Sequence, residues 1–219
     1  MTPFLWQEQQ FWLTPQRYIF WENNHTLLLS DLHLGKTGHF RKEGIAVPQQ
    51  AYQYDLHRLF EAITTHKPKQ VLIVGDLFHS RANRELDWFT RWRASIPQVH
   101  ITLVAGNHDL LEPQWYVRQG VEVVDCWNHQ HIWFMHNPED AGKAPHLPPS
   151  SALVFGHIHP AISLQGAGRQ RLRLPCFYFS GQQCILPAFG AFTGTYSLKP
   201  KSGDQIFAIT KNELLPLNF

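Results

Sequence analysis

The stretch Val71-Leu72-Ile73-Val74-Gly75-Asp76 contains the pattern that decides the fold. A continuous apolar run of this kind is typical of a strand buried on both faces of a sheet. The run ends in a glycine and a carboxylate, and other predicted strands also end in side chains that bind metals. These strands are residues 26–29, 71–74, 101–104, 132–135 and 152–155. Sites in open α/β sheets lie beyond the carboxyl ends of the strands, so we expect these side chains to converge.

The residues that follow these strands form one candidate metal centre. They comprise two carboxylates, one amide and four imidazoles: Asp31, His33, Asp76, Asn107, His136, His157 and His159. This mixture of nitrogen and oxygen ligands suits manganese, iron, zinc or cobalt better than magnesium or calcium. Seven side chains are too many for one ion, whereas they suit two ions that share a bridging carboxylate. Gly75, Gly106 and Gly156 each directly precede a ligand, which we interpret as room for a sharp turn or for the approach of an ion.

The remaining pattern predicts a mixed α/β fold with sheet layers at its centre. Apolar residues fall at helical spacing in residues 49–66 and 83–96. Two hairpins are expected, formed by residues 18–21 with 26–29 and by residues 121–124 with 132–135. From Cys176 to Thr210, short runs broken by Gly and Pro predict antiparallel sheet. The 219 residues suit a single domain, 1–219.

Composition excludes several classes of protein. The net charge of +2 permits a polyanionic partner without requiring one. No basic start followed by an apolar run marks a secretory signal, and no apolar run approaches the ~20 residues of a membrane span, so we expect a cytoplasmic protein with no membrane partner. The three cysteines do not form a disulfide framework. Buried thiols are favoured over a contact between Cys176 and Cys184.

The order of these motifs resembles that of the calcineurin-like metallophosphoesterases. The motifs are Asp31-Leu32-His33, Gly75-Asp76, Gly106-Asn107-His108-Asp109, His136 and Gly156-His157-Ile158-His159. The resemblance implies an α/β (α+β) fold of two packed mixed β-sheets flanked by helices. It also implies that Asp76 bridges two ions, the first held with Asp31, His33 and His159 and the second with Asn107, His136 and His157. The chain departs from the family at Asn137, where many members have glycine.

A narrower resemblance is to the DNA-ligase-associated metallophosphoesterases. It is carried by residues 30–36, 40–41, 44–48 and 186–194, the last reading Leu-Pro-Ala-Phe-Gly-Ala-Phe-Thr-Gly. This subfamily resemblance implies a nucleic-acid phosphodiester substrate in bacterial DNA repair. It also implies action alongside a DNA ligase, a helicase and an exonuclease.

The expected activity is that of a manganese-dependent phosphodiesterase or nuclease, with iron or zinc as alternative metals. We expect a hydroxide that bridges the two ions to attack phosphorus, while His108 stabilises or protonates the leaving oxygen. Lys36, Arg41 and His79 are candidates for substrate contact, and Asp109 is expected to brace its loop. Arg169, Arg171 and Arg173 alternate, which on a strand gives either a solvated face or a basic stripe for phosphates.

Three alternative functions are open. A lipid-nucleotide pyrophosphohydrolase, or another phosphodiesterase acting on a small nucleotide, would use the same metal centre, but no amphipathic insertion long enough for an acyl-chain lid is visible in the sequence. A protein phosphatase is disfavoured because Ala105 precedes Gly106, where those enzymes have arginine. A metal-binding scaffold without catalysis is disfavoured because all seven ligands are present.

Overall fold

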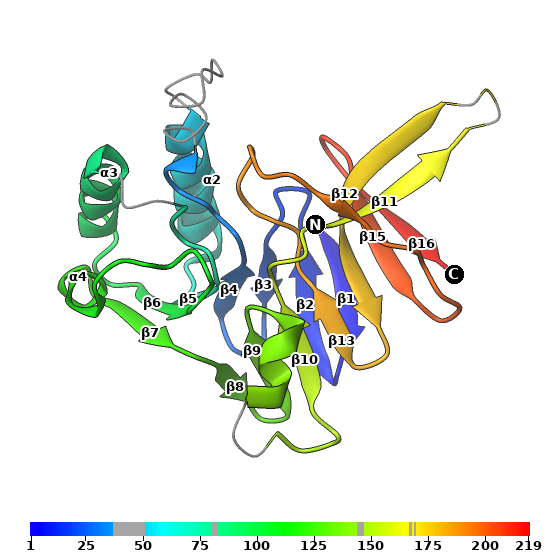
Figure 1. The fold of residues 1–219 in the computed structure, drawn as a ribbon, viewed down its shortest axis with the longest axis horizontal. Helices are drawn as coiled ribbons and strands as arrows, with labels where there is room; N and C mark the ends of the chain where they lie inside the picture. Colours follow the sequence, from blue (N-terminus) through cyan, green and yellow to red (C-terminus); the bar gives the residue numbers. More distant parts are fainter. Residues whose placement is uncertain (37–50, 80–82, 144–146, 167, 169) are drawn as a thin grey trace.

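The computed structural model describes residues 1–36, 51–79, 83–143, 147–166, 168 and 170–219, and it contains two mixed β-sheets packed against each other (Figure 1). The first sheet has the order β1-β2-β3-β4-β5-β6-β7, antiparallel from β1 to β4 and parallel from β4 to β7. Its strands are β1 (Thr2–Trp6), β2 (Gln9–Leu13), β3 (Ile19–Trp21), β4 (Thr26–Leu29), β5 (Gln70–Val74), β6 (His100–Val104) and β7 (Val121–Val124).

The second sheet has the order β14-β11-β12-β13-β10-β9-β8, with β15 paired to β12 and β16 paired to β15. Within it, β9, β10 and β13 run parallel to one another. Its strands are β8 (Trp127–His129), β9 (Ile132–Met135), β10 (Ala152–Phe155), β11 (Pro160–Gln165), β12 (Arg171–Ser180), β13 (Gln183–Ile185), β14 (Tyr196–Ser197), β15 (Gln205–Ile209) and β16 (Leu214–Asn218). Figure 1 shows the β11–β12 hairpin extending away from the body of the molecule.

The helices α2 (Ala51–His66), α3 (Asn83–Ala94) and α4 (Pro113–Arg118) gather on the side of the first sheet (Figure 1). A short 3-10 helix, η1 (Pro138–Lys143), follows β9. Among the described residues, no helix combines the length and the apolar character needed to cross a lipid bilayer.

Strands β4 and β5 are buried on both faces, as their continuous apolar sequences predict. Leu27 and Leu29 pack into a core with α2, whereas Leu28 packs into the core between the two sheets. Successive side chains of a strand point to opposite faces, so each run must be apolar throughout. The predicted strands therefore lie where an α/β sheet needs them.

One predicted hairpin is wrong. Residues 121–124 form β7 in the first sheet, parallel to β6, and residues 132–135 form β9 in the second sheet. The chain passes from one sheet to the other between Val124 and Trp127, and β8 supplies the antiparallel partner of β9. Both segments have strand-like sequences, and such a pattern does not reveal which sheet a strand joins.

Other elements differ in smaller ways. The hairpin of β3 and β4 is confirmed, with Trp21 opposite Thr26. The helix expected over residues 49–66 is confirmed from Ala51, and its expected start lies outside the described residues. The second helix ends at Ala94 instead of Ile96 because the chain tightens there, with the Ile96 N–H donating to the Arg93 carbonyl at 3.2 Å. The sequence did not predict β1, β2 and α4.

Candidate metal centre

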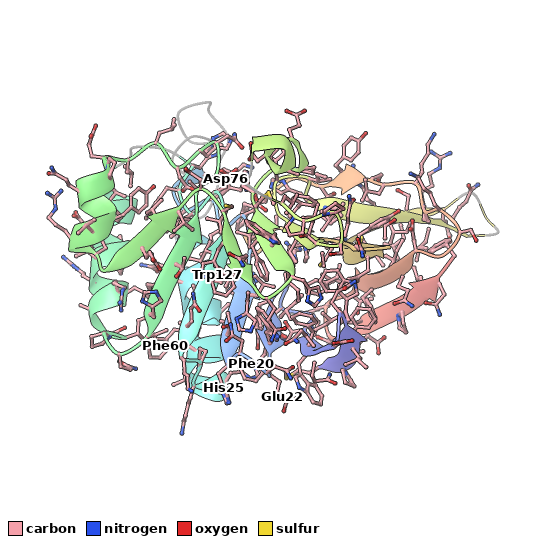
Figure 2. All side chains as sticks on the ribbon, turned by 90° about the horizontal axis from the view of Figure 1, so that it is seen from below. Phe20, Glu22, His25, Phe60, Asp76 and Trp127 are labelled. Carbon is pink, nitrogen blue, oxygen red and sulfur yellow. The ribbon has the colours of Figure 1, made fainter. Side chains whose placement is uncertain are left out.

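Five strand ends supply the side chains of the candidate centre, and they come from both sheets. Strands β4, β5 and β6 of the first sheet end before Asp31, Asp76 and Asn107, while β9 and β10 of the second end before His136 and His157. Figure 2 shows Asp76 at the opposite end of the molecule from the turn that contains Glu22 and His25, where β4 begins. The sequence predicted one shared edge, whereas the residues meet where the carboxyl ends of parallel strands in two sheets face each other.

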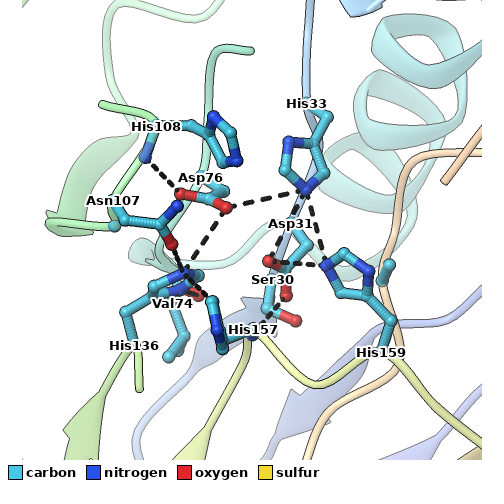
Figure 3. Close-up of polar contacts among 12 residues, drawn as sticks. Ser30, Asp31, His33, Val74, Asp76, Asn107, His108, His136, His157 and His159 are labelled. Carbon is cyan, nitrogen blue, oxygen red and sulfur yellow. Dashed lines mark hydrogen bonds and ion pairs between the residues drawn. The ribbon is translucent and has the colours of Figure 1, made fainter. Parts of the chain in front are cut away.

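A first group of ligands consists of Asp31, His33 and His159. The Nε2 atoms of the two histidines lie 3.4 Å apart. Asp31 Oδ1 lies 3.1 Å from Nε2 of His159 and 3.9 Å from Nε2 of His33. One carboxylate oxygen and two imidazole nitrogens therefore converge on a single point (Figure 3).

A second group consists of Asp76, His136 and His157, with Asn107 beside them. Around His136 Nε2 lie Asn107 Oδ1 at 3.1 Å, His157 Nδ1 at 3.2 Å and Asp76 Oδ2 at 3.4 Å. His136 Nδ1 lies 3.2 Å from the Val74 carbonyl. If Nδ1 carries the proton and donates it to that carbonyl, the lone pair of Nε2 points toward the other ligands.

Asp76 connects the two groups. Its Oδ2 atom lies 3.6 Å from His33 Nε2 in the first group and 3.4 Å from His136 Nε2 in the second. The other oxygen, Oδ1, accepts a hydrogen bond of 2.9 Å from the backbone N–H of His108. The carboxylate is thereby fixed with one oxygen between the two sets of histidines (Figure 3).

The donor atoms fit divalent metal ions. Atoms bound to one ion at about 2.0–2.2 Å lie roughly 3–3.6 Å from one another, and most of the separations above fall in that range. Asp31 Oδ1 is buried and accepts no hydrogen bond from the described residues, although buried carboxylate oxygens normally have a partner. A cation between this oxygen and the two imidazoles would supply that partner.

Electrostatics at the centre follow from burial and from close pairing. Burial lowers the pKa of His33 to about 3, which keeps its imidazole in the neutral form that binds metals. Burial alone would raise the pKa of Asp76, but its hydrogen bond with His136, the charge of that ring and the N–H of His108 lower it to about 2. Burial opposes the charge on His136, yet the contact with Asp76 raises its pKa to about 9.

The backbone at the ligands is unusual. Five of them have positive φ angles: Asp31 (54°), His33 (48°), Asp76 (50°), His157 (61°) and His159 (52°). This left-handed region is costly for residues other than glycine, and such strain concentrates at functional sites. At Asp31, Asp76 and His157 it turns the chain within two residues of the ends of β4, β5 and β10.

The glycines before the ligands serve protein packing. At Gly75, which has φ +80°, a Cβ would collide with the His136 ring. At Gly156, a Cβ would lie 2.5 Å from the Val74 carbonyl and 2.8 Å from Asp31 Oδ2. The turn expected at Gly75 is therefore present, whereas the close approach at Gly156 is that of neighbouring protein atoms.

The other predicted site residues lie close to this centre where the structure describes them. The His108 ring is half-buried, and its centroid lies 5.4 Å from that of His33 and 4.8 Å from that of His79. Burial lowers the pKa of Lys36, while the charges of Asp31 and Asp76 raise it, so its ammonium group lies within the field of the centre. Arg41 lies outside the described residues.

Three further residues have the positions that the sequence indicated. Asp109 accepts hydrogen bonds from the backbone N–H groups of Gly106, at 2.9 Å, and Phe78, at 3.2 Å, so it braces the loop. Arg171 and Arg173 are exposed and alternate on β12, while Arg169 lies outside the described residues. Arg173 also donates to the carbonyl of Thr195.

Asn137, the departure from the family pattern, has a local role. Its Oδ1 accepts a hydrogen bond of 3.1 Å from the N–H of Glu139 in the first turn of η1. An asparagine that follows β9 thus starts the short helix and leaves His136 in the second group. Cys126, Cys176 and Cys184 form no disulfide, and the last two are buried, as expected.

A buried cluster beside the centre was missed at the level of sequence. Arg17, Asp55 and Arg58 contact the loop of residues 188–191, which lies against Asp31. The motif at residues 186–194 stood out in the sequence, but its pattern did not indicate which residues it would meet.

Comparison with known proteins shows which family and structures the chain is similar to. The family model described as calcineurin-like phosphoesterase matches residues 25–172. The crystal structure of the nuclease MPE of Pseudomonas putida is similar at 30% sequence identity and a TM-score of 0.81, covering 98% of this chain and 99% of that chain. YfcE, a phosphoesterase from E. coli, is similar at 15% identity and a TM-score of 0.46, covering 88% and 97%. The search of curated proteins finds no match.

Proposed function

The chain belongs to the calcineurin-like phosphoesterase family, and on that premise we propose that it is a two-metal phosphodiesterase that cleaves nucleic acid. Membership makes it a metal-dependent phosphoesterase. The observation that carries the proposal is the position of Asp76 Oδ2 between the two ligand groups. A carboxylate shared in this way suits two ions ~3.5–4 Å apart, an arrangement found in enzymes that cleave phosphoesters.

Two features support a nucleic-acid substrate. The Pseudomonas putida protein is a nuclease, and its similarity extends over 98% of this chain, beyond the residues that the family model matches. The exposed side chains of Arg171 and Arg173 on β12 also offer positive charge that suits a phosphate backbone. We further propose that the chain acts in DNA repair in the cytoplasm, with a ligase, a helicase and an exonuclease as the partners that the subfamily resemblance implies.

Two groups of side chains would hold the two ions. Asp31, His33 and His159 would hold one, Asn107, His136 and His157 the other, and Asp76 would contact both. The mixture of imidazole and carboxylate suits manganese, with iron or zinc as alternatives. When bound, such ions activate water as a nucleophile and neutralise charge on the phosphoryl group.

Two further residues would act on the substrate, and a third would support one of them. Lys36, whose ammonium group lies in the field of Asp31 and Asp76, would attract the scissile phosphate. His108 would donate a proton to the leaving oxygen, a role supported by its position beside the first group, with its ring 5.4 Å from that of His33. His79 would support that ring, since the two rings lie 4.8 Å apart.

Hydrolysis of simple esters and of DNA by the manganese-loaded protein tests the proposal. We expect cleavage of bis-p-nitrophenyl phosphate to exceed that of p-nitrophenyl phosphate, and we expect cleavage of single-stranded or duplex DNA. Asp76→Ala should abolish both activities and lower the metal content. Asp125→Ala is the matched control, because Asp125 is an exposed carboxylate between β7 and β8. Diester activity without DNA cleavage would contradict the nucleic-acid substrate, and full activity in Asp76→Ala would contradict the site.

A further inference from the structure

The loop of residues 188–191 is hydrogen-bonded to the backbone of a candidate metal ligand. The Phe189 N–H donates to the Ser30 carbonyl at 2.8 Å, and the Gly190 N–H donates to the Asp31 carbonyl at 3.0 Å. The loop thus pairs with the residues that come just after β4. It supports the backbone of Asp31, which has a positive φ angle.

The contact between this loop and the ligand leaves no spare room. A Cβ at Gly190 would lie 2.5 Å from the Leu32 carbonyl and 3.2 Å from the Asp31 carbonyl. The backbone of the loop therefore packs directly on the backbone of Asp31. Any shift of the loop must move the ligand or break these hydrogen bonds.

Three charged residues hold the opposite side of the loop. Arg58 Nη2 donates to the Phe189 carbonyl at 3.1 Å, and the guanidinium lies 4.1 Å from the centroid of the Phe189 ring. Asp55 accepts from the Ala191 N–H at 3.1 Å and pairs with Arg58 Nη1 at 3.0 Å. Arg17 Nη1 donates to the carbonyls of Ala188, at 3.3 Å, and Gly190, at 3.4 Å.

Burial of these charges indicates that the side chains hold the loop in place. The side chains of Arg58 and Asp55 are only 10% and 7% exposed, and burying charge is costly unless it is paired and hydrogen-bonded. Arg58 Nη2 also donates to the Gln16 carbonyl at 2.7 Å, but the other main-chain hydrogen bonds described above are directed at this one loop. Two residues of α2 and one residue before β3 are thereby connected to the end of β4.

We propose that Arg17, Asp55 and Arg58 are positioning residues that fix Asp31 through the loop of residues 188–191. They thereby set the affinity of the Asp31, His33 and His159 group for its divalent ion. The inference rests on the metal-binding role proposed above for these ligands. Loss of a residue that orients a metal ligand through hydrogen bonds typically weakens metal binding by about 10- to 100-fold.

Isothermal titration calorimetry, with Mn²⁺ added to the metal-free protein, tests this proposal. We expect wild type to bind two ions. In Arg58→Ala, one of the two should bind about 10- to 100-fold more weakly while the other is unchanged. Raising the manganese concentration should then restore most of the turnover, so the apparent affinity for the ion changes more than kcat.

Arg93→Ala is the matched control. Arg93 also fixes loops through backbone carbonyls, donating to Gln119 at 3.0 Å, Ile96 at 2.6 Å and Val99 at 3.1 Å. These loops precede β6 and β7, whereas the candidate ligands follow the carboxyl ends of the strands. We expect its loss to lower thermal stability and to leave both manganese affinities unchanged. Equal manganese affinities in wild type, Arg58→Ala and Arg93→Ala would overturn the proposal.

Milder variants keep the test decisive if Arg58→Ala does not fold. Arg58→Lys retains the positive charge but cannot make the same paired contacts, so it should weaken the same ion by an intermediate factor. Gly190→Ala should also weaken binding of that ion, because its Cβ would push the loop away from the Leu32 carbonyl. Normal affinities in both would overturn the positioning role. Because no nucleic acid is present, failure to cleave DNA would not affect this result, whereas wild type that binds no manganese would overturn both proposals.

Discussion

At the scale of single residues, the two oxygens of each carboxylate in the centre have different roles. Asp31 Oδ2 accepts a hydrogen bond of 3.0 Å from the His157 N–H, and Asp76 Oδ1 accepts one of 2.9 Å from the His108 N–H. In each, the remaining oxygen faces imidazole nitrogens. Backbone donors thus orient the ligands, and they do so even when the side chain of the donor residue is changed.

His108→Ala should therefore separate catalysis from metal binding. The variant keeps the backbone N–H that holds Asp76, so its manganese content should equal that of wild type. If His108 protonates the leaving oxygen, DNA cleavage should fall by ~10²–10⁴-fold. Hydrolysis of bis-p-nitrophenyl phosphate should fall far less, because p-nitrophenolate is a weak base and needs little protonation. Steady-state kinetics on both substrates give the comparison.

His100→Ala is the control for this variant, because His100 is exposed on β6 and pairs with Glu122 at 3.0 Å. It should retain activity on both substrates. Equal losses on DNA and on the activated diester in His108→Ala would count against an acid role.

The candidate ligands with positive φ angles should lower the stability of the folded chain, and this cost should be measurable. His159 has φ +52°, whereas His136 is not among the residues with positive φ. In metal-free protein, His159→Gly should be more stable than His159→Ala by about 1 kcal/mol, because glycine avoids the cost of that conformation. Urea unfolding measures the difference. At His136 the glycine variant should gain nothing over alanine, and the same gain there would contradict the explanation.

The candidate ligands could be found from the sequence, whereas the residues that support them could not. Each candidate ligand lies within a few residues of the end of an apolar strand, so its place is encoded locally. Arg58 instead contacts Phe189 across 131 positions, and Asp55 contacts Ala191 across 136. Such pairs depend on how α2 packs against a distant loop, and no spacing in the sequence records it.

At the scale of elements, the parallel strands were predictable and their assignment to sheets was not. Strands β4, β5 and β6 have continuous apolar runs because helices cover one face and the second sheet covers the other. The passage from β7 to β8 has no equivalent signal. Val124 and Trp127 pack into the same core between the sheets, so both sides of the crossing are similarly apolar.

The attachment of α2 to the loop of residues 188–191 should give a pH-dependent stability. Burial raises the pKa of Asp55 to about 6 from 3.8, although Arg58 opposes the shift. The folded protein then binds this proton more tightly than the unfolded chain. The contribution of Asp55 to the free energy of unfolding is greatest below pH 3.8 and is lost as the pH rises through 6, by about 3 kcal/mol at most.

Denaturant unfolding of metal-free wild type and Asp55→Asn between pH 4 and pH 7 measures this effect. Relative to Asp55→Asn, wild type should lose stability as the pH rises. Asp87→Asn, which changes an exposed carboxylate on α3, should show the same pH dependence as wild type. Curves of wild type and Asp55→Asn that stay parallel would contradict the raised pKa.

At the scale of the whole molecule, the centre joins the two sheets. Asp31, Asp76 and Asn107 follow strands of the first sheet, whereas His136 and His157 follow strands of the second. Each of the two ligand groups contains residues from both sheets. Bound ions would therefore stabilise the interface between the sheets as well as bind substrate.

Metal removal should consequently lower global stability. An ion present at 100 times its Kd adds about 2.7 kcal/mol to the free energy of unfolding, and each kcal/mol shifts Tm by roughly 2–4 °C in a chain of this size. Calorimetry of wild type should show Tm higher in manganese than in EDTA by about 5–10 °C for each ion bound. Asp76→Ala removes the residue common to both groups and should lose most of this difference, while Asp125→Ala should keep it. A manganese shift that persists undiminished in Asp76→Ala would mean that the stabilising ions bind elsewhere on the protein.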